Sequence, residues 1–166
     1  MSVIAARVNK DEILIAADSI ILKEEIKRTN FNKLLKLNGM IIGGCGSASE
    51  LCLMFDYAAD NCPNAARTHE VIEFMQGFAD YKETITGSRD IENEYILAYK
   101  GRLYAIERFF VQCVEDYIAI GQGEPFALTA LHLGHDPDVA VMCACELCSD
   151  VAPPIVNLSM TRSEVD

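Results

Sequence analysis

Positive charge and long apolar runs are both scarce in this sequence. The chain has 14 lysines and arginines against 25 aspartates and glutamates, a formal net charge of −11 at pH 7. A surface that acidic repels phosphate backbones, so nucleic acid is not an expected partner. No apolar stretch approaches the roughly 18 residues of a membrane-spanning helix. The apolar start is followed at once by polar residues 9–12, with no small-residue cleavage site. We therefore expect a cytoplasmic protein without membrane contact.

Several common catalytic motifs are also missing. The sequence contains no G-x-x-x-x-G-K-[ST] phosphate loop, no H-E-x-x-H zinc motif and no G-x-S-x-G nucleophile elbow. Any chemistry must therefore come from residues that such motifs do not mark.

The seven cysteines do not form a pattern typical of disulfides or zinc. Their number is odd and most lie in apolar runs, so we expect free thiols packed as small apolar side chains. Only Cys143, Cys145 and Cys148 cluster, and their spacing is not that of paired C-x-x-C ligands. His132 and His135 could complete a metal site there, but we expect no metal and no cofactor.

Length and composition favour one globular domain over residues 1–166. Apolar residues make up 51% of the chain and charged residues 23%, which is close to a globular average. A chain of this length buries a sizeable core without disulfides or metals.

The order of predicted elements favours an α+β sandwich. Alternation and turn residues such as Asn38-Gly39 and Lys100-Gly101 predict strands. These strands span residues 2–7, 12–17, 29–37, 40–44, 94–99, 102–106, 117–120 and 155–160. Helix pairs are predicted within 47–83 and 125–148, between runs of strands. We expect two stacked antiparallel sheets flanked by helix pairs, a four-layer αββα arrangement, and not a βαβ unit.

Capping and periodicity give the detail of these helices. Ser47 to Glu50 has the S-x-x-E form of a capping box, and Pro125 and Pro137 suit first helical turns. Two apolar faces are predicted by i, i+3, i+4 spacing: Leu51, Cys52, Phe55, Ala58 and Ala59 on the first helix, and Val71, Phe74, Met75, Phe78 and Ala79 on the second. The helix ending near Cys148 is apolar on most sides, so we expect it to be buried between layers.

Three glycines, Gly43, Gly44 and Gly46, come just before the first helix. Such a turn can cradle an anion at a helix N-terminus. Tight packing between strand and helix explains the same glycines equally simply.

Six stretches of the chain, taken in order, resemble the proteasome β subunit and its bacterial relative, the HslV peptidase. They are Val3–Arg7, Ile13–Ser19 (ILIAADS), Phe31–Leu37 (FNKLLKL), Ile41–Glu50 (IIGGCGSASE), Lys100–Glu107 and Tyr117–Ala127. The resemblance covers most of the chain.

This resemblance implies an N-terminal nucleophile hydrolase, in which a hydroxyl on the first mature residue attacks a peptide carbonyl. The α-amine of that residue is the base; it titrates near ~7.7–8.0, and a nearby ammonium lowers that pKa further. When the family's roles are carried over to this sequence, removal of Met1 exposes Ser2 as the nucleophile. Asp18 is then the carboxylate and Lys33 the ammonium. A backbone N–H of the Gly46-Ser47 turn binds the oxyanion. The 16-residue interval between Ser2 and Asp18 matches the family.

The sequence also departs from the family pattern. Serine replaces threonine as nucleophile, and Gln122 stands where a small hydroxyl residue is expected. Asp150 could supply a supporting acid, but Pro153 stands in the place of its hydroxyl partner. Singly, Ser2 could be an ordinary start residue, Asp18 a turn residue and Lys33 a solvated strand charge.

By this resemblance we expect a subunit of a self-compartmentalised peptidase. It would form a homo-oligomeric ring and cleave unfolded polypeptide, with an ATP-dependent unfoldase as a candidate partner. Apolar surface on the helix of Leu51 and Phe55, or on that of Phe74 and Phe78, would be buried between subunits. The alternatives are a catalytically inactive ring-forming scaffold and a small-molecule amidase of the same fold.

Overall fold

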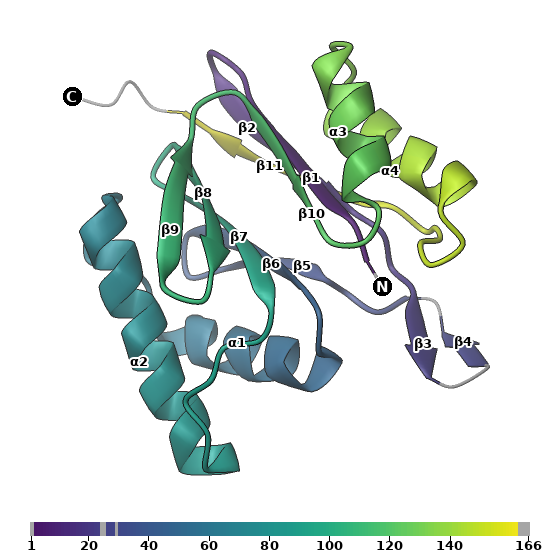
Figure 1. Ribbon diagram of the computed structural model, residues 1–166. Helices are drawn as coiled ribbons and strands as arrows, with labels where there is room; N and C mark the ends of the chain where they lie inside the picture. Colours follow the sequence, from purple (N-terminus) through teal and green to yellow (C-terminus); the bar gives the residue numbers. More distant parts are fainter. Residues whose placement is uncertain (1, 24–25, 29, 163–166) are drawn as a thin grey trace.

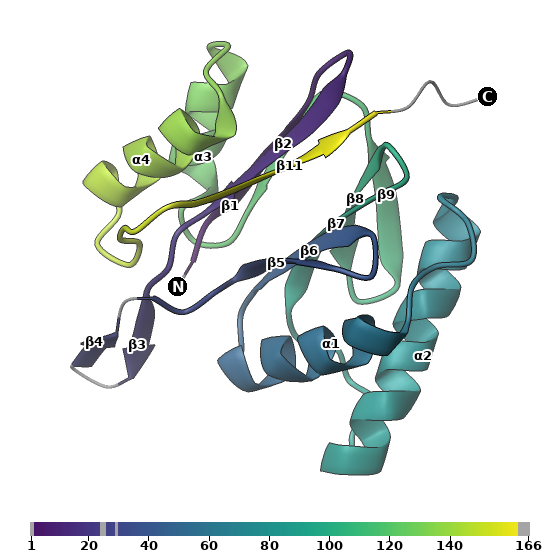
Figure 2. The same cartoon turned by 180° about the vertical axis from the view of Figure 1, so that it is seen from behind.

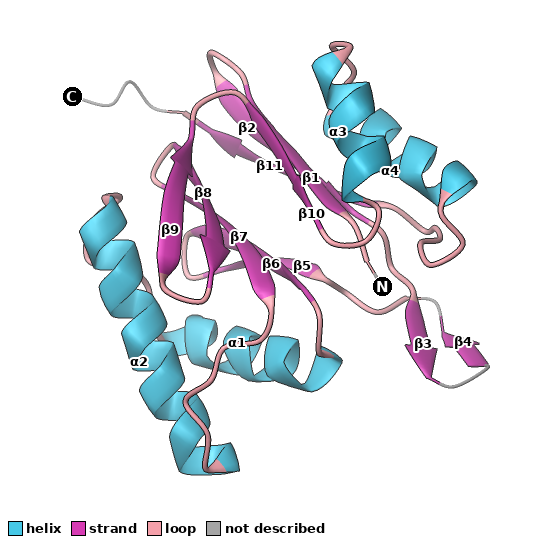
Figure 3. Ribbon diagram, viewed as in Figure 1, coloured by secondary structure: helices cyan, strands magenta, loops and turns pink. Residues whose placement is uncertain are grey.

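The computed structural model describes residues 2–23, 26–28 and 30–162. Its centre is a pair of stacked antiparallel sheets, with two helices on each outer face (Figure 1). Colouring by secondary structure makes the four layers visible (Figure 3). The predicted αββα sandwich is therefore confirmed.

The first sheet has the strand order β10-β1-β2-β11. Its strands are β1 (Ile4–Val8), β2 (Glu12–Ala17), β10 (Tyr117–Ile120) and β11 (Val156–Thr161). Neighbouring residues of a strand face opposite sides of a sheet. Ile4 and Ile15 accordingly pack toward the second sheet, whereas Ala5 and Ala16 pack under the helices α3 (Glu124–His132) and α4 (Pro137–Leu147).

The second sheet has the strand order β5-β6-β7-β8-β9. Its strands are β5 (Leu34–Leu37), β6 (Met40–Cys45), β7 (Glu94–Tyr99), β8 (Arg102–Glu107) and β9 (Phe110–Val114). Its outer face packs on α1 (Ala48–Asp60) and α2 (Thr68–Thr86). Both views place the start of β1 near β3 (Ile21–Lys23) and β4 (Ile26–Arg28), which pair as a small separate sheet (Figure 2).

Several predicted strands need correction. Of the strand predicted over 29–37, only Leu34–Leu37 is observed, and Thr29 lies outside the described residues. The strands β3, β4 and β9 were not predicted.

Two helix faces also differ from expectation. On α1, Cys52 and Ala59 are exposed and Met54 is buried in their place, because the true stripe runs through positions 51, 54 and 58. The helix α4 is not buried between layers: Val139, Met142 and Leu147 are 41%, 49% and 62% exposed. Its apolar outer side therefore faces away from the sheets.

No helix among the described residues is long and apolar enough to cross a bilayer.

Candidate active site

A buried ion pair lies where β2 ends and β5 begins. Lys33 Nζ lies 2.8 Å from each carboxylate oxygen of Asp18. The two side chains are 3% and 0% exposed, so Lys33 is not a solvated strand charge. Asp18 also accepts hydrogen bonds from the backbone N–H groups of Val3, at 2.9 Å, and Ile20, at 3.3 Å. The carboxylate therefore fixes both the ammonium and the backbone that follows Ser2.

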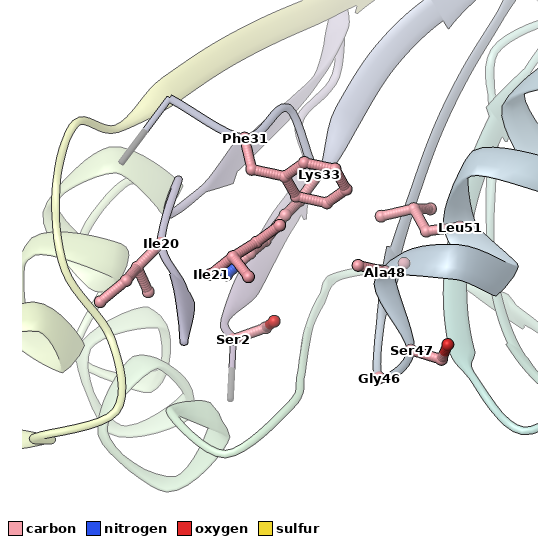
Figure 4. A pocket seen from close by; sticks show the side chains of 10 residues that line it. Ser2, Ile20, Ile21, Phe31, Lys33, Gly46, Ser47, Ala48 and Leu51 are labelled. Atoms are coloured by element: carbon pink, nitrogen blue, oxygen red, sulfur yellow. The ribbon is translucent and has the colours of Figure 1, made fainter. Parts of the chain in front are cut away.

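Ser2 lies beside this pair and is itself buried, with 3% of its surface exposed. It lines a pocket of about 120 Å³ together with Lys33, Gly46 and Ser47. Figure 4 shows the Ser2 hydroxyl on one side of the pocket and the Gly46-Ser47 turn on the other. The structure thus brings together four residues that the sequence pointed to: Ser2, Asp18, Lys33 and Gly46.

Glycines after β10 make the position of Ser2 possible. The carbonyl of Ser2 accepts a hydrogen bond of 3.1 Å from the N–H of Gly123. Gly121 has φ +91°, and a Cβ there would lie 2.5 Å from the Ser2 carbonyl oxygen. Only a residue without a side chain fits this close approach.

The predicted oxyanion turn has two backbone N–H groups, those of Gly46 and Ser47, and their surroundings differ. The Ser47 N–H donates to Asn93 Oδ1 at 2.5 Å, so it is not available to a substrate. Among the described residues the Gly46 N–H has no such acceptor, which makes it the candidate oxyanion donor. The Ser47 hydroxyl points away from Ser2 (Figure 4) and accepts from the Glu50 N–H, capping α1.

The other two glycines before α1 are explained by packing. A Cβ on Gly43 would lie 2.8 Å from the Lys33 carbonyl oxygen, and one on Gly44 would lie 2.8 Å from the Tyr95 ring. These glycines let β6 approach its neighbours closely, and an anion is not needed to explain them.

Glu50 does not complete the capping box by returning to Ser47. Its carboxylate instead binds Lys82 Nζ at 2.6 Å, the Asn93 N–H at 3.0 Å and the Tyr95 hydroxyl at 2.9 Å. Burial raises the pKa of Glu50, but these contacts and the Glu92 N–H outweigh it and hold the pKa below its ordinary value. Sequence reasoning missed this network, although Lys82 continues the apolar stripe of α2 and is buried with it.

The sequence also suggested Gln122 and Asp150 as supporting residues. Neither lines the pocket, and Gln122 is exposed. Asp18, which pairs with Lys33, does not line the pocket either, so the supporting roles of Gln122 and Asp150 stay predictions.

Cys45, at the end of β6, is the other candidate nucleophile nearby. Burial raises the pKa of its thiol to about 12, so the thiol stays protonated and unreactive at neutral pH. All seven cysteines are free thiols, and no group of three metal-ligating side chains occurs among the described residues.

The fold is shared with solved structures over nearly the whole chain. The Thiobacillus denitrificans protein BPH, a β-proteasome homologue, matches with a TM-score of 0.88 at 20% identity, covering 98% of this chain and all of that one. BPH in complex with epoxomicin matches with a TM-score of 0.84 at 19% identity, covering 97% and 99%. Eukaryotic HslV from Trypanosoma brucei matches with a TM-score of 0.72 at 18% identity, covering 96% and 99%. The chain has the proteasome β/HslV fold of N-terminal nucleophile hydrolases.

At these identities the likeness establishes the proteasome β/HslV fold and leaves the chemistry to the residues themselves. No protein-family model matches the sequence. No curated protein matches it either. In this fold, the buried pair and the Gly46 turn flank Ser2 from two sides, an arrangement suited to attack by a hydroxyl on a carbonyl.

Proposed function

We propose that this chain is a peptidase subunit in which the Ser2 hydroxyl, exposed as the first residue by removal of Met1, cleaves peptide bonds. The buried Asp18–Lys33 pair against Ser2 carries the proposal. Two charges withdrawn from water are costly, and apolar residues of similar size would serve a fold equally well. Buried charge pairs beside a pocket are a common mark of a reactive site.

The chemistry follows from the positions of these groups. The α-amine of Ser2 takes the hydroxyl proton as Oγ bonds to the substrate carbonyl carbon. The carbonyl π electrons move to oxygen, and the Gly46 N–H stabilises that oxyanion. Collapse expels the amine of the leaving peptide, which takes the proton from the α-ammonium. Water, deprotonated by the same amine, then hydrolyses the ester and frees Ser2.

Asp18 and Lys33 prepare the base for this cycle. The Lys33 ammonium disfavours a second positive charge nearby, so more of the α-amine stays neutral near pH 7. Asp18 keeps Lys33 charged and in place. When Met1 is retained, the nitrogen of Ser2 is an amide that cannot act as a base.

The pocket indicates which residue precedes the cleaved bond. Apolar side chains of Ile20, Ile21, Phe31 and Leu51 line it (Figure 4). An apolar substrate side chain fits this wall best. We propose unfolded polypeptide as substrate, enclosed in a homo-oligomeric ring and supplied by an ATP-dependent unfoldase.

A noncatalytic ring-forming scaffold is the second candidate. The observation that favours it is that Gln122 and Pro153 stand where the resemblance implies hydroxyl residues. A small-molecule amidase would use the same site and differ only in substrate.

The test compares three forms of the chain: the form beginning at Ser2, verified by intact mass, the same form with Ser2→Ala, and a form with one residue retained before Ser2. We expect only the first to hydrolyse peptide reporters with an apolar residue before the cleaved bond. Only that form should gain the mass of epoxomicin, the ligand in the BPH complex. Absence of hydrolysis and of epoxomicin labelling in all three overturns the proposal and favours the scaffold, whereas equal measurable rates in all three overturn the role of Ser2. Cleavage of simple amides but not peptides favours the amidase.

A further inference from the structure

We propose that Asn93 is a positioning residue for this reaction, and that its side-chain amide holds the Gly46-Ser47 turn so that the Gly46 N–H meets the oxyanion. The inference rests on the proposed function. Asn93 lies just before β7 and is 1% exposed. It is separated from Ser47 by 46 residues in sequence.

The side-chain amide of Asn93 makes two hydrogen bonds with the backbone of Ser47. Its Oδ1 accepts from the Ser47 N–H at 2.5 Å, and its Nδ2 donates to the Ser47 carbonyl at 2.9 Å. Two opposed hydrogen bonds from one planar group fix both the distance and the orientation of the turn. An amide can do this because it carries both a donor and an acceptor.

Gly46 packs so closely against Asn93 that a residue with a side chain would not fit in its place. Its φ is +137°, a conformation that side chains rarely adopt, and a Cβ there would collide with Asn93 Oδ1. Such backbone conformations persist only where the surroundings determine them, and they cluster at functional sites.

Asn93 is itself held by the buried network behind the turn. Its backbone N–H donates to Glu50 Oε1 at 3.0 Å, and Glu50 pairs with Lys82, which also donates to the Asp90 carbonyl. A continuous set of buried and part-buried polar contacts therefore joins α2 to the turn.

This rigidity has a chemical consequence. A donor stabilises a developing oxyanion most when it is oriented before the reaction, and removing one such donor outright costs about 10²–10³ in kcat. Asn93 acts through Gly46 and does not touch the substrate. Its removal should therefore cost less, about 10- to 100-fold.

The experiment compares Asn93→Ala and Asn93→Asp with the control Tyr99→Phe. Tyr99 lies on the same strand β7, and Tyr99→Phe removes a hydrogen bond to Cys62 Sγ without changing Asn93, Ser47 or Glu50. Asn93→Asp keeps the size and the acceptor, but sets an oxygen against the Ser47 carbonyl.

Each chain beginning at Ser2 is measured for thermal unfolding, kcat, KM, and affinity for a peptide aldehyde and the matching peptide alcohol. The aldehyde carbon bonds to Ser2 Oγ and gives a hemiacetal whose oxygen occupies the oxyanion position, whereas the alcohol binds without a bond.

For both Asn93 variants we expect kcat and aldehyde affinity to fall by a similar factor. KM and alcohol affinity should stay as in the wild type, because the pocket is unchanged. The shape of the pH profile should stay as in the wild type for Asn93→Ala, which leaves the charges near the α-amine unchanged; Asn93→Asp adds a carboxylate and does not serve for this comparison. Tyr99→Phe should unfold at a lower temperature yet keep its kcat and aldehyde affinity.

Wild-type kcat and aldehyde affinity in a folded Asn93→Ala or Asn93→Asp chain overturn the inference and leave the proposed function standing. An equal loss of kcat in Tyr99→Phe overturns it too, because the role of Asn93 would then be general stability. A wild-type chain that begins at Ser2 and neither cleaves reporters nor binds the aldehyde overturns the proposed function, and the inference with it.

Discussion

Asp18 and Lys33 carry opposite charges in a place that water does not reach. Their two 2.8 Å contacts, with the N–H groups of Val3 and Ile20, satisfy the carboxylate completely. Such a pair adds little net stability, but removing one partner is costly because it strands the other charge. Stability and activity at this pair can therefore be separated by substitution.

Lys33→Ala should impair both properties. Loss of the ammonium raises the pKa of the Ser2 α-amine, so less neutral base remains at pH 7. Hydrolysis should fall by more than about 10²-fold, and the acid limb of the pH–rate profile should move to higher pH. Unfolding in urea should show a loss of about 3–5 kcal/mol, because Asp18 is left buried and unpaired.

The double variant Asp18→Asn/Lys33→Met serves as the control for this prediction. It removes both charges, so it should regain much of the stability of the wild type while remaining inactive. Activity in Lys33→Ala comparable to the wild type, or recovery of activity in the double variant, would contradict the role given to the pair.

The sequence led to some of these residues and not to others, for physical reasons. Ser2, Asp18, Lys33 and Gly46 lie on short ordered stretches whose spacing could be compared with a known family. Asn93 has no such context: it is one polar residue before a strand, and its partner Ser47 is 46 positions away. Contacts made only by the folding of distant segments leave no local pattern in the sequence.

At the scale of elements, patterning found the long helices and most sheet strands but missed β3, β4 and β9. The turn between β8 and β9 shows why, since it contains Arg108 at φ +57° and no glycine or asparagine. The usual hairpin residues are therefore absent from a hairpin that nevertheless forms. Likewise α4 is apolar on most sides although it lies in an outer layer. Its periodicity alone could not show in which layer it lies.

The Glu50–Lys82 pair joins α1 to α2, and its contribution should depend on pH. The pKa of Glu50 is lowered in the folded chain from 4.5. The folded state therefore gains stability from the ionised group above that value, and loses it as the pH falls through the lower folded pKa. Glu50→Gln should be less stable than the wild type by about 3–5 kcal/mol at neutral pH. The gap should narrow as the pH is lowered below 4.5.

Urea unfolding of both chains across pH 3–7 measures this gap. Glu146→Gln, which changes an exposed carboxylate on α4, is the control and should follow the wild-type curve. A gap between Glu50→Gln and the wild type that stays constant over the whole range would show that ionisation of Glu50 does not stabilise the fold.

At the scale of the whole molecule, several exposed apolar side chains belong to elements that the sequence did not suggest. The sequence predicted apolar surface on the helix of Leu51 and Phe55 or on that of Phe74 and Phe78; Leu51, Phe74 and Phe78 are buried against the second sheet, and Phe55 is partly buried there. Four large apolar residues on α4 or just after α3 are instead 41–71% exposed: Leu133, Val139, Met142 and Leu147. We call these four residues the α3–α4 surface. On a chain with a net charge of −11, apolar exposure of this kind indicates a contact with another protein surface.

We expect the α3–α4 surface to join copies of this chain in the proposed ring. Sedimentation velocity at micromolar concentration should then show a particle several times the size of one chain. Met142→Glu should reduce that size, because the contact would bury an unpaired carboxylate. Its thermal unfolding should change little, since the side chain is 49% exposed in the single chain. Ile85→Glu, at a site on α2 that is 54% exposed and lies outside the surface, is the matched control and should keep the wild-type size. A wild type that sediments as a monomer would argue against any ring, whereas loss of assembly in Ile85→Glu alone would move the contact to α2.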